Sequence, residues 1–166
     1  MFLGVLGCTQ VPRVKEAGDI IVENEKMHLA AMEQDRIFDI LSKKDPTLEL
    51  YRDEASRKHV ERFFIELTGS ERISRPILRY ADRHDISLFL AFSVAYVESR
   101  FNARAVNKNA SSVDRGVFQL NSRAFPRLKE RDFFDPETSA KYGISHLKFC
   151  LQEGGNDIAA IAMYNA

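Results

Sequence analysis

Apolar residues recur every three or four positions along most of this chain, the spacing that puts side chains on one face of an α-helix. The pattern predicts helices over residues 19–44, 47–67, 73–83, 87–100, 136–152 and from 157 onward. Helix-stopping residues separate these segments: Pro46 follows the first, Gly69 the second and Gly155 the fifth. The density of such segments predicts a mainly α-helical body.

The stretch between the fourth and fifth predicted helices has a different pattern. Residues 101–114 are rich in Asn, Ser and Lys and show little apolar periodicity, which is typical of a loop. The short apolar run 116–120 follows, and we expect the strands of a small β-hairpin there.

Composition narrows the class of protein. The chain has 166 residues, of which 45% are hydrophobic and 29% charged, enough apolar material for one compact domain with an N-terminal extension. The 24 basic side chains balance the 24 acidic ones. Because no basic excess attracts phosphate backbones, nucleic acid is not expected as a partner.

The N-terminus allows two interpretations. Residues 1–7 are apolar and uncharged, and Val5-Leu6-Gly7-Cys8 resembles the lipobox of bacterial lipoproteins. On this interpretation residues 1–19 are a signal remnant and linker, and Cys8 carries a lipid anchor in the periplasm or cell envelope. No Lys or Arg precedes the apolar run, so the alternative is an ordinary tail of a cytosolic protein.

The remaining metal-ligand and thiol candidates are dispersed. Cys150 lies among apolar residues of a predicted helix and is expected to be a packed thiol without a disulfide. The four histidines are scattered, with no pair at metal-ligand spacing. We therefore expect no metal and no organic cofactor.

Glu98 occupies an unusual position for a carboxylate. Counting back from it by three, four, seven and eight residues gives Ala95, Val94, Ala91 and Leu90, all apolar. Burial on this face would raise the pKa of Glu98 toward the range of a general acid that protonates a glycosidic oxygen. The alternative is a side chain that turns to solvent or accepts a hydrogen bond from a loop amide.

Three ordered segments surround this glutamate in sequence: Glu-Ser-Arg-Phe-Asn at 98–102, Gly-Val-Phe-Gln at 116–119 and Met-Tyr-Asn-Ala at 163–166. They resemble the motifs Glu-Ser-x-Phe-Asn, Gly-Leu-Met-Gln and Ala-Tyr-Asn-Ala-Gly of the soluble lytic transglycosylases (SLT domain), within the lysozyme-like superfamily. The resemblance covers roughly residues 73–166. It implies the mainly α fold of goose-type lysozymes and lytic transglycosylases, with a small β-hairpin and here an N-terminal helical extension.

The resemblance also implies a reaction. Family members cleave the β-1,4 bond between N-acetylmuramic acid and N-acetylglucosamine in peptidoglycan. Glu98 matches the sole catalytic acid/base, which protonates the leaving oxygen and then takes the proton of the muramic acid 6-hydroxyl as that oxygen attacks the anomeric carbon. The substrate's N-acetyl carbonyl replaces a second carboxylate, and the product carries a 1,6-anhydromuramic end.

Five further residues match positions that contact substrate in the family. Ser99 lies beside the acid, Gln119 matches a glutamine that binds an acetamido group, and Tyr164 matches a tyrosine whose hydroxyl points toward the acid. Asn165 holds the adjacent turn, and Phe118 is expected to line the cleft. For Ser99 the alternative is capping of its own helix, and for Phe118 it is core packing.

The chain also departs from the family pattern. Phe118 replaces the usual Met, and residues 111–116 replace a Gly-rich approach to the middle motif. We expect the catalytic domain, residues 71–166, to be truncated at its C-terminus, because the sequence ends at Ala166, before the last motif glycine.

Two other functions stay open on the sequence alone. Asp114 is the candidate second acid of a muramidase that adds water instead of cyclising, and a non-catalytic module that binds cell-wall glycan is the other alternative. Residues 20–70, the predicted extension, either pack on the domain, act as a spacer or hold a protein partner. The protein is expected to be a monomer that binds glycan strands.

Overall fold

The computed structural model describes the backbone of residues 17–164 and the side chains of residues 25–164. Its helices are α1 (Ala17–Leu41), α2 (Pro46–Arg52), α3 (Glu54–Thr68), α4 (Glu71–His84), α5 (Leu88–Ser99), α6 (Glu130–Phe133), α7 (Pro136–Gly154) and α8 (Asp157–Tyr164). Its strands are β1 (Val106–Lys108), β2 (Val113–Arg115) and β3 (Leu120–Asn121). The prediction of a mainly α protein is confirmed.

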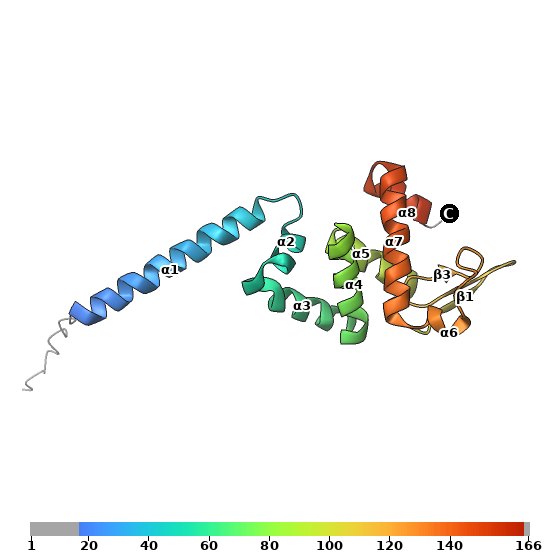
Figure 1. Cartoon of the computed structure of the whole chain (residues 1–166), viewed down its shortest axis with the longest axis horizontal. Helices are drawn as coiled ribbons and strands as arrows, with labels where there is room; N and C mark the ends of the chain where they lie inside the picture. Colours follow the sequence, from blue (N-terminus) through green and yellow to red (C-terminus); the bar gives the residue numbers. More distant parts are fainter. Residues whose placement is uncertain (1–16, 165–166) are drawn as a thin grey trace, which may run out of the picture. The chain divides into compact units, whose positions relative to one another are not determined.

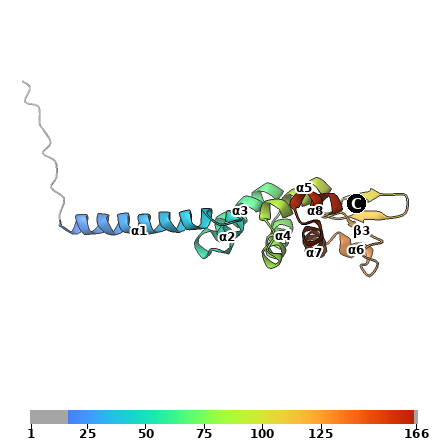
Figure 2. The same cartoon turned by 90° about the horizontal axis from the view of Figure 1, so that it is seen from above.

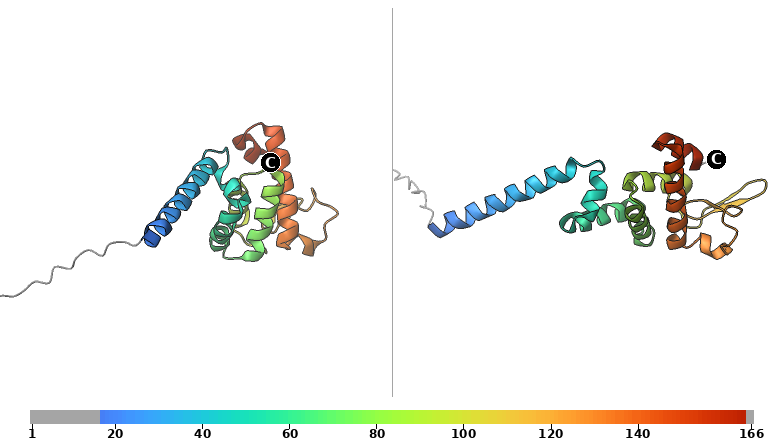
Figure 3. Two further views of the ribbon diagram at one scale, coloured as in Figure 1. Left: turned by 60° about the vertical axis from the view of Figure 1, so that its left-hand side comes forward. Right: turned by 45° about the horizontal axis from the view of Figure 1, so that its top comes forward.

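The chain divides into two compact units, residues 1–42 and residues 43–166. Within its described part the first unit is the helix α1 (Figures 1 and 3). The second unit contains every other described element, so the short helices α2 and α3 belong with the helices that follow them. The boundary expected from the sequence between the helical extension and the catalytic domain, at residues 70 and 71, stays a prediction.

The single helix predicted over 47–67 is two helices, because Asp53 interrupts it. Asp53 has an extended backbone, with φ −72° and ψ 127°, and ends α2. Its carboxylate accepts hydrogen bonds from the backbone N–H of Ser56 (2.9 Å) and from the Ser56 hydroxyl (2.6 Å), which caps the start of α3. Asp45 caps α2 in the same way, through the N–H of Leu48 at 3.0 Å.

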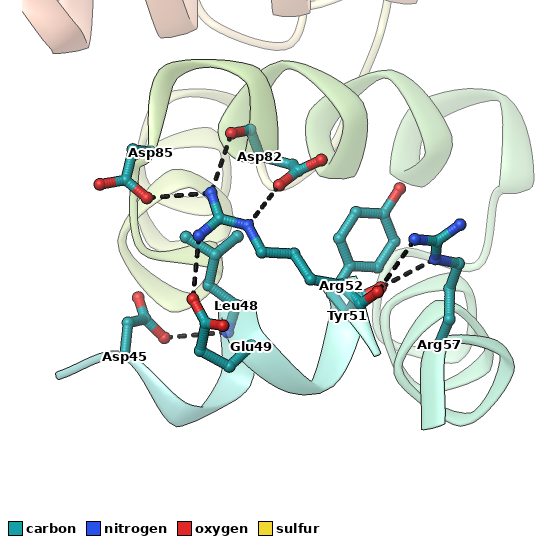
Figure 4. A network of polar contacts seen from close by, with 8 residues as sticks. All are labelled: Asp45, Leu48, Glu49, Tyr51, Arg52, Arg57, Asp82 and Asp85. Atoms are coloured by element: carbon teal, nitrogen blue, oxygen red, sulfur yellow. Dashed lines mark hydrogen bonds and ion pairs between the residues drawn. The ribbon is translucent and has the colours of Figure 1, made fainter. Parts of the chain in front are cut away.

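A cluster of charges attaches α2 to the end of α4 (Figure 4). The Arg52 guanidinium lies 2.7 Å from Asp82, 2.9 Å from Asp85 and 2.9 Å from Glu49. The Asp82 carboxylate raises the pKa of Arg52 more than any other neighbour does. More than a third of this side chain is exposed, so the stabilisation it contributes is about 1 kcal/mol at most.

The core of the second unit extends from α2 to α7. Leu48 and Phe64, from α2 and α3, are buried together with the inner faces of the later helices, and the Phe64 ring stacks on Phe92 of α5 with centroids 4.1 Å apart. Helices α4 and α7 pack against each other, with α3 on one side of the pair and the sheet and α6 on the other (Figures 1 and 2). Residues 43–70 therefore supply part of the core.

The strands do not lie where the sequence pattern placed them. Three antiparallel strands pair in the order β1-β2-β3, with Val106 opposite Arg115 and Arg115 opposite Leu120. Two of them lie in the region expected to be a loop, because they are polar and exposed or half-buried and so lack apolar alternation. The apolar run 116–120 is instead a turn that reaches a strand only at its end.

The positive φ angles of Gly116 (79°) and Gln119 (45°) account for this turn, since a strand needs negative φ angles.

In the part of the chain described, no helix is both long and apolar enough to cross a membrane.

Replacing Phe64 with Ala tests whether α3 belongs to the core. We expect a loss of about 3 to 5 kcal/mol in the free energy of unfolding, because a fully buried aromatic ring leaves a cavity. Phe63 is the matched control: it is the neighbouring residue, its ring is half exposed, and Phe63→Ala should cost under about 1 kcal/mol. Urea denaturation of the full chain measures both, and equal costs would contradict the packing of α3 against α5.

Candidate active site

Glu98 is the penultimate residue of α5, at the end of that helix's buried face. Ala91, Val94 and Ala95, three of the four residues that precede it on this face, are buried. The helix stops where Arg100 takes a left-handed conformation, φ 52°, and donates its N–H to the Tyr96 carbonyl at 2.7 Å. Glu98 is thus held partly buried at a helix end instead of being directed into solvent.

Two causes raise the pKa of Glu98 above the ordinary glutamate value. The larger is burial, which disfavours the charged carboxylate, and the second is the negative charge of Asp114. Among the described residues the structure gives the Glu98 carboxylate no hydrogen-bond or ion-pair partner that would offset these effects. A glutamate in such surroundings holds its proton to higher pH, as a general acid needs to.

The turn 116–119 is where helices α5, α7 and α8 meet. The Val117 carbonyl accepts a hydrogen bond from the Ser99 hydroxyl of α5 at 2.8 Å. At Phe118 the backbone N–H donates to Ser139 Oγ of α7 at 3.2 Å, and the carbonyl accepts from the Tyr164 hydroxyl of α8 at 3.2 Å. Three side chains from three helices therefore fix the backbone of this turn beside Glu98.

Two glycines allow the close approach that these bonds require. A Cβ on Gly116 would lie 2.0 Å from the Phe133 carbonyl oxygen, and a Cβ on Gly143 of α7 would lie 2.3 Å from the Phe118 ring. Neither backbone nor a buried ring can move far, so a larger residue at Gly116 would push the turn away from α6 and one at Gly143 would push it away from α7.

Tyr164 connects the turn to the glutamate. Burial, and then the Glu98 charge, raise the pKa of Tyr164 well above its ordinary value, so the phenol keeps its proton and donates it to the Phe118 carbonyl. A small cavity of about 70 Å³ lies between Glu98 and Tyr164, and the apolar side chains of Val94, Val97 and Ile161 line it. Apolar groups on both sides of the carboxylate account for its desolvation.

Asp114 lies on β2, and its two oxygens are held by amides. Asn109 Nδ2 and Asn121 Nδ2 each donate to the carboxylate at 2.7 Å. The next residue, Arg115, lies 3.4 Å from Glu130. The strand directs a fixed negative charge toward the region of Glu98.

Three of the residues predicted to contact substrate are Ser99, Gln119 and Asn165, and their surroundings differ. The Ser99 hydroxyl lies near two backbone carbonyls, that of Val117 in the turn and, at 3.1 Å, that of Ala95 in its own helix. The contact within its own helix agrees with the capping alternative, and a contact with substrate stays a prediction. Gln119 is half-buried, and its side-chain amide donates to the Gly116 carbonyl at 2.9 Å. Asn165 lies outside the described residues.

Phe118 corrects an expectation. Its side chain is only 1% exposed and packs beside Gly143, so the ring belongs to the core and does not line a cleft. The part of Phe118 that serves the site is its backbone, which bonds Ser139 and Tyr164.

Sequence reasoning missed Ser139 and Gly143. Both are small residues on α7 four positions apart, and Ser139 is fully buried. The sequence signal that could have found them is a pair of small residues on one helix face. Such a pair marks a place where another segment comes close to the helix.

No metal centre is found among the described residues, where no three His, Cys, Asp or Glu side chains converge. Cys150 is a buried free thiol, as predicted, and burial raises its pKa. The raised pKa disfavours the reactive thiolate, so this cysteine packs and does not act as a nucleophile.

The fold and the site define a helical domain with one desolvated glutamate opposite a small sheet. A family model described as Transglycosylase SLT domain matches residues 75–166, more than half of the chain. The protein therefore belongs to the transglycosylase SLT family, and its predicted lysozyme-like fold class is confirmed. No curated protein and no solved structure matches the chain.

Replacing Gly143 with Ala tests the contact between α7 and the turn. The added methyl group would overlap the Phe118 ring, so we expect the protein to lose about 1 to 3 kcal/mol and several degrees of Tm. Ser145→Ala, an exposed change on the same helix, should leave Tm within about 2 °C. Thermal unfolding followed by circular dichroism measures both. Alanine favours a helix over glycine by about 1 kcal/mol, so a raised Tm for Gly143→Ala would show that Phe118 does not pack there.

Proposed function

We propose that this protein is a peptidoglycan lytic transglycosylase that cleaves the β-1,4 bond between N-acetylmuramic acid and N-acetylglucosamine and leaves 1,6-anhydromuramic ends. The observation that carries the proposal is the environment of Glu98: partly buried, without a hydrogen-bond partner among the described residues, and with a raised pKa, in a chain of the SLT family. Membership in that family implies glycan strands of peptidoglycan as the substrate.

The proposed mechanism uses Glu98 twice. Protonated Glu98 gives its proton to the glycosidic oxygen as the bond to the anomeric carbon breaks. The substrate's own N-acetyl carbonyl supports the positive charge that develops at that carbon. Glu98, now a carboxylate, then takes the proton of the muramic acid 6-hydroxyl as its oxygen bonds to the anomeric carbon, which closes the anhydro ring and returns the proton to the enzyme.

The residues around Glu98 have supporting roles in this proposal. Ser99 and Tyr164 hold the turn 116–119 against the helix that carries the acid. Gln119 lies on that turn and is placed to contact an acetamido group of the glycan once its side chain leaves the Gly116 carbonyl. Val97 is three-quarters exposed next to Glu98 and offers an apolar surface to a sugar ring.

A location in the periplasm or cell envelope belongs to the same proposal, because the substrate is there. The lipid anchor through Cys8 stays a prediction and lies outside the described residues. A protein partner for the N-terminal helices and the monomeric state likewise stay predictions.

Glu98→Gln tests the proposed acid. Incubated with peptidoglycan sacculi, the wild-type chain should release muropeptides one water lighter than hydrolysed ones, and the variant should lose at least about a hundredfold in rate. Mass spectrometry of the soluble products measures both, with Glu66→Gln on the exposed surface of α3 as the charge-matched control. Equal activity of Glu98→Gln and wild type would contradict the proposal, and binding to sacculi without turnover would favour a non-catalytic glycan-binding module.

The same substitution has an expected effect on stability. The folded protein holds the Glu98 proton more tightly than the unfolded chain, so the charged carboxylate destabilises the fold as the pH rises from the ordinary glutamate pKa through the raised one. At pH 7 the neutral amide removes this cost, and Tm should be unchanged or rise by up to about 4 °C. A marked fall in Tm would mean that Glu98 takes part in a stabilising ion pair.

Hydrolysis is the second candidate function, and the charge of Asp114 near Glu98 is the observation that favours it. In a muramidase Asp114 would position the attacking water. In the lytic transglycosylase it acts only through the pKa of Glu98, by adding a negative charge that favours the protonated form.

Asp114→Asn separates these roles. If the protein is a lytic transglycosylase, the variant should keep turning over, and the alkaline limb of its kcat/KM profile should move to lower pH because a charge that raises the Glu98 pKa is gone. Asp35→Asn, on the exposed surface of α1, should leave the profile unchanged. Loss of all activity at every pH, with water-added products from the wild type, would establish the muramidase instead.

A further inference from the structure

A second groove, of about 450 Å³, lies where α4 and α7 begin, away from the cavity between Glu98 and Tyr164. Three arginines from three different elements line it: Arg72 from the first turn of α4, Arg104 from the loop after α5, and Arg131 from α6. Residues 134–136 and Ile73 also line it. The groove is large enough for a small ligand.

The positive charge of this groove is not neutralised by its surroundings. Across the part of the chain described, Arg72 and Arg104 make no ion pair, and Arg131 has only a 3.6 Å contact with Asp132. One carboxylate, Asp135, also lines the groove; its Oδ2 accepts from the Thr138 N–H at 3.0 Å and from the Thr138 hydroxyl at 2.8 Å as the cap of α7. Its single negative charge is outnumbered by the three positive charges of the arginines.

A neighbouring groove, by contrast, is lined by arginines that form ion pairs with glutamates. It shares Arg72, Asp135 and Pro136 with the 450 Å³ groove and is also lined by Arg75 and Arg79. Here each additional arginine has a glutamate: Arg75 bonds Glu71, and Arg79 bonds Glu137. The 450 Å³ groove thus differs from its neighbour in having more arginines than carboxylates to pair with them, and an excess of guanidinium groups around a concavity favours binding of an anion.

We propose that the groove lined by Arg72, Arg104 and Arg131 binds the carboxylate groups of the peptide stems on the glycan substrate. The identity of the ligand rests on the proposed function. Planar guanidinium groups bind carboxylates and phosphates through paired hydrogen bonds, and the stems supply free carboxylates on the strand that the enzyme cleaves. Arg104 lies in the loop that follows α5, six residues after Glu98, so the helix that carries the proposed acid and the groove are consecutive along the chain.

The test is calorimetric titration of the full chain with a synthetic stem tetrapeptide whose carboxylates are free. The variant R72Q/R104Q/R131Q should bind it at least about tenfold more weakly than wild type, and wild-type affinity should fall as salt rises from about 50 to about 200 mM because the charges are exposed. The charge-matched control K26Q/K58Q/R62Q removes three exposed cations from α1 and α3 and should bind like wild type. The same peptide with amidated carboxylates should bind wild type as weakly as the free peptide binds the triple variant.

Three results would overturn the proposal: equal peptide affinity for wild type and the arginine variant, equal affinity of free and amidated peptide, or binding of inorganic phosphate with no binding of the peptide. The last would identify a phosphate site.

Glycan strands stripped of peptides separate this proposal from the proposed function. Wild type and R72Q/R104Q/R131Q should release anhydro products from them at equal rates. Absence of such products from wild type would refute the transglycosylase activity, while the loss of peptide binding in the variant would still support a carboxylate-binding groove.

Discussion

The backbone of the turn 116–119 is the constraint on which the rest of the site depends. Its N–H and C=O groups are bonded by side chains of α5, α7 and α8, so one short segment positions a helix that precedes it and two helices that follow it. Buried backbone groups must find partners, and in this turn the partners are Ser99, Ser139 and Tyr164. Two of these three hydrogen bonds join the segments around residues 98, 118 and 164, which the sequence presents as separate motifs.

The chemistry of Glu98 follows from that arrangement. Tyr164 and the apolar residues Val94 and Val97 line the cavity beside the carboxylate, and Asp114 contributes a like charge. Each of these disfavours the ionised form of Glu98, which costs the folded protein stability. The fold tolerates this cost because other contacts, above all the buried core of α3, α4, α5 and α7, hold the helices around the carboxylate in place. A desolvated acid within a stable frame is the physical basis of the proposed proton transfer.

The sequence alone predicted the helices and the burial around Glu98 because both are expressed in local spacing. It placed the strands wrongly because the turn at Gly116 is apolar while the strands are polar, the reverse of the usual pattern. It assigned Phe118 to a cleft because a motif records which residue is present and not which way its ring packs. Ser139 and the hold of two asparagines on Asp114 depend on contacts across many residues, which periodicity does not encode.

The most direct test is a pH titration of the Glu98 side-chain carboxyl, followed by carbon-13 NMR in the full-length protein. It shows whether the fold desolvates Glu98 and makes it a proton donor. The resonance is assigned by its absence from the spectrum of Glu98→Gln. We expect a titration midpoint clearly above the ordinary glutamate value of 4.5. A midpoint at or below 4.5 would mean that the carboxylate is solvated or paired, and it would contradict the proposed roles of the turn, the cavity and Asp114.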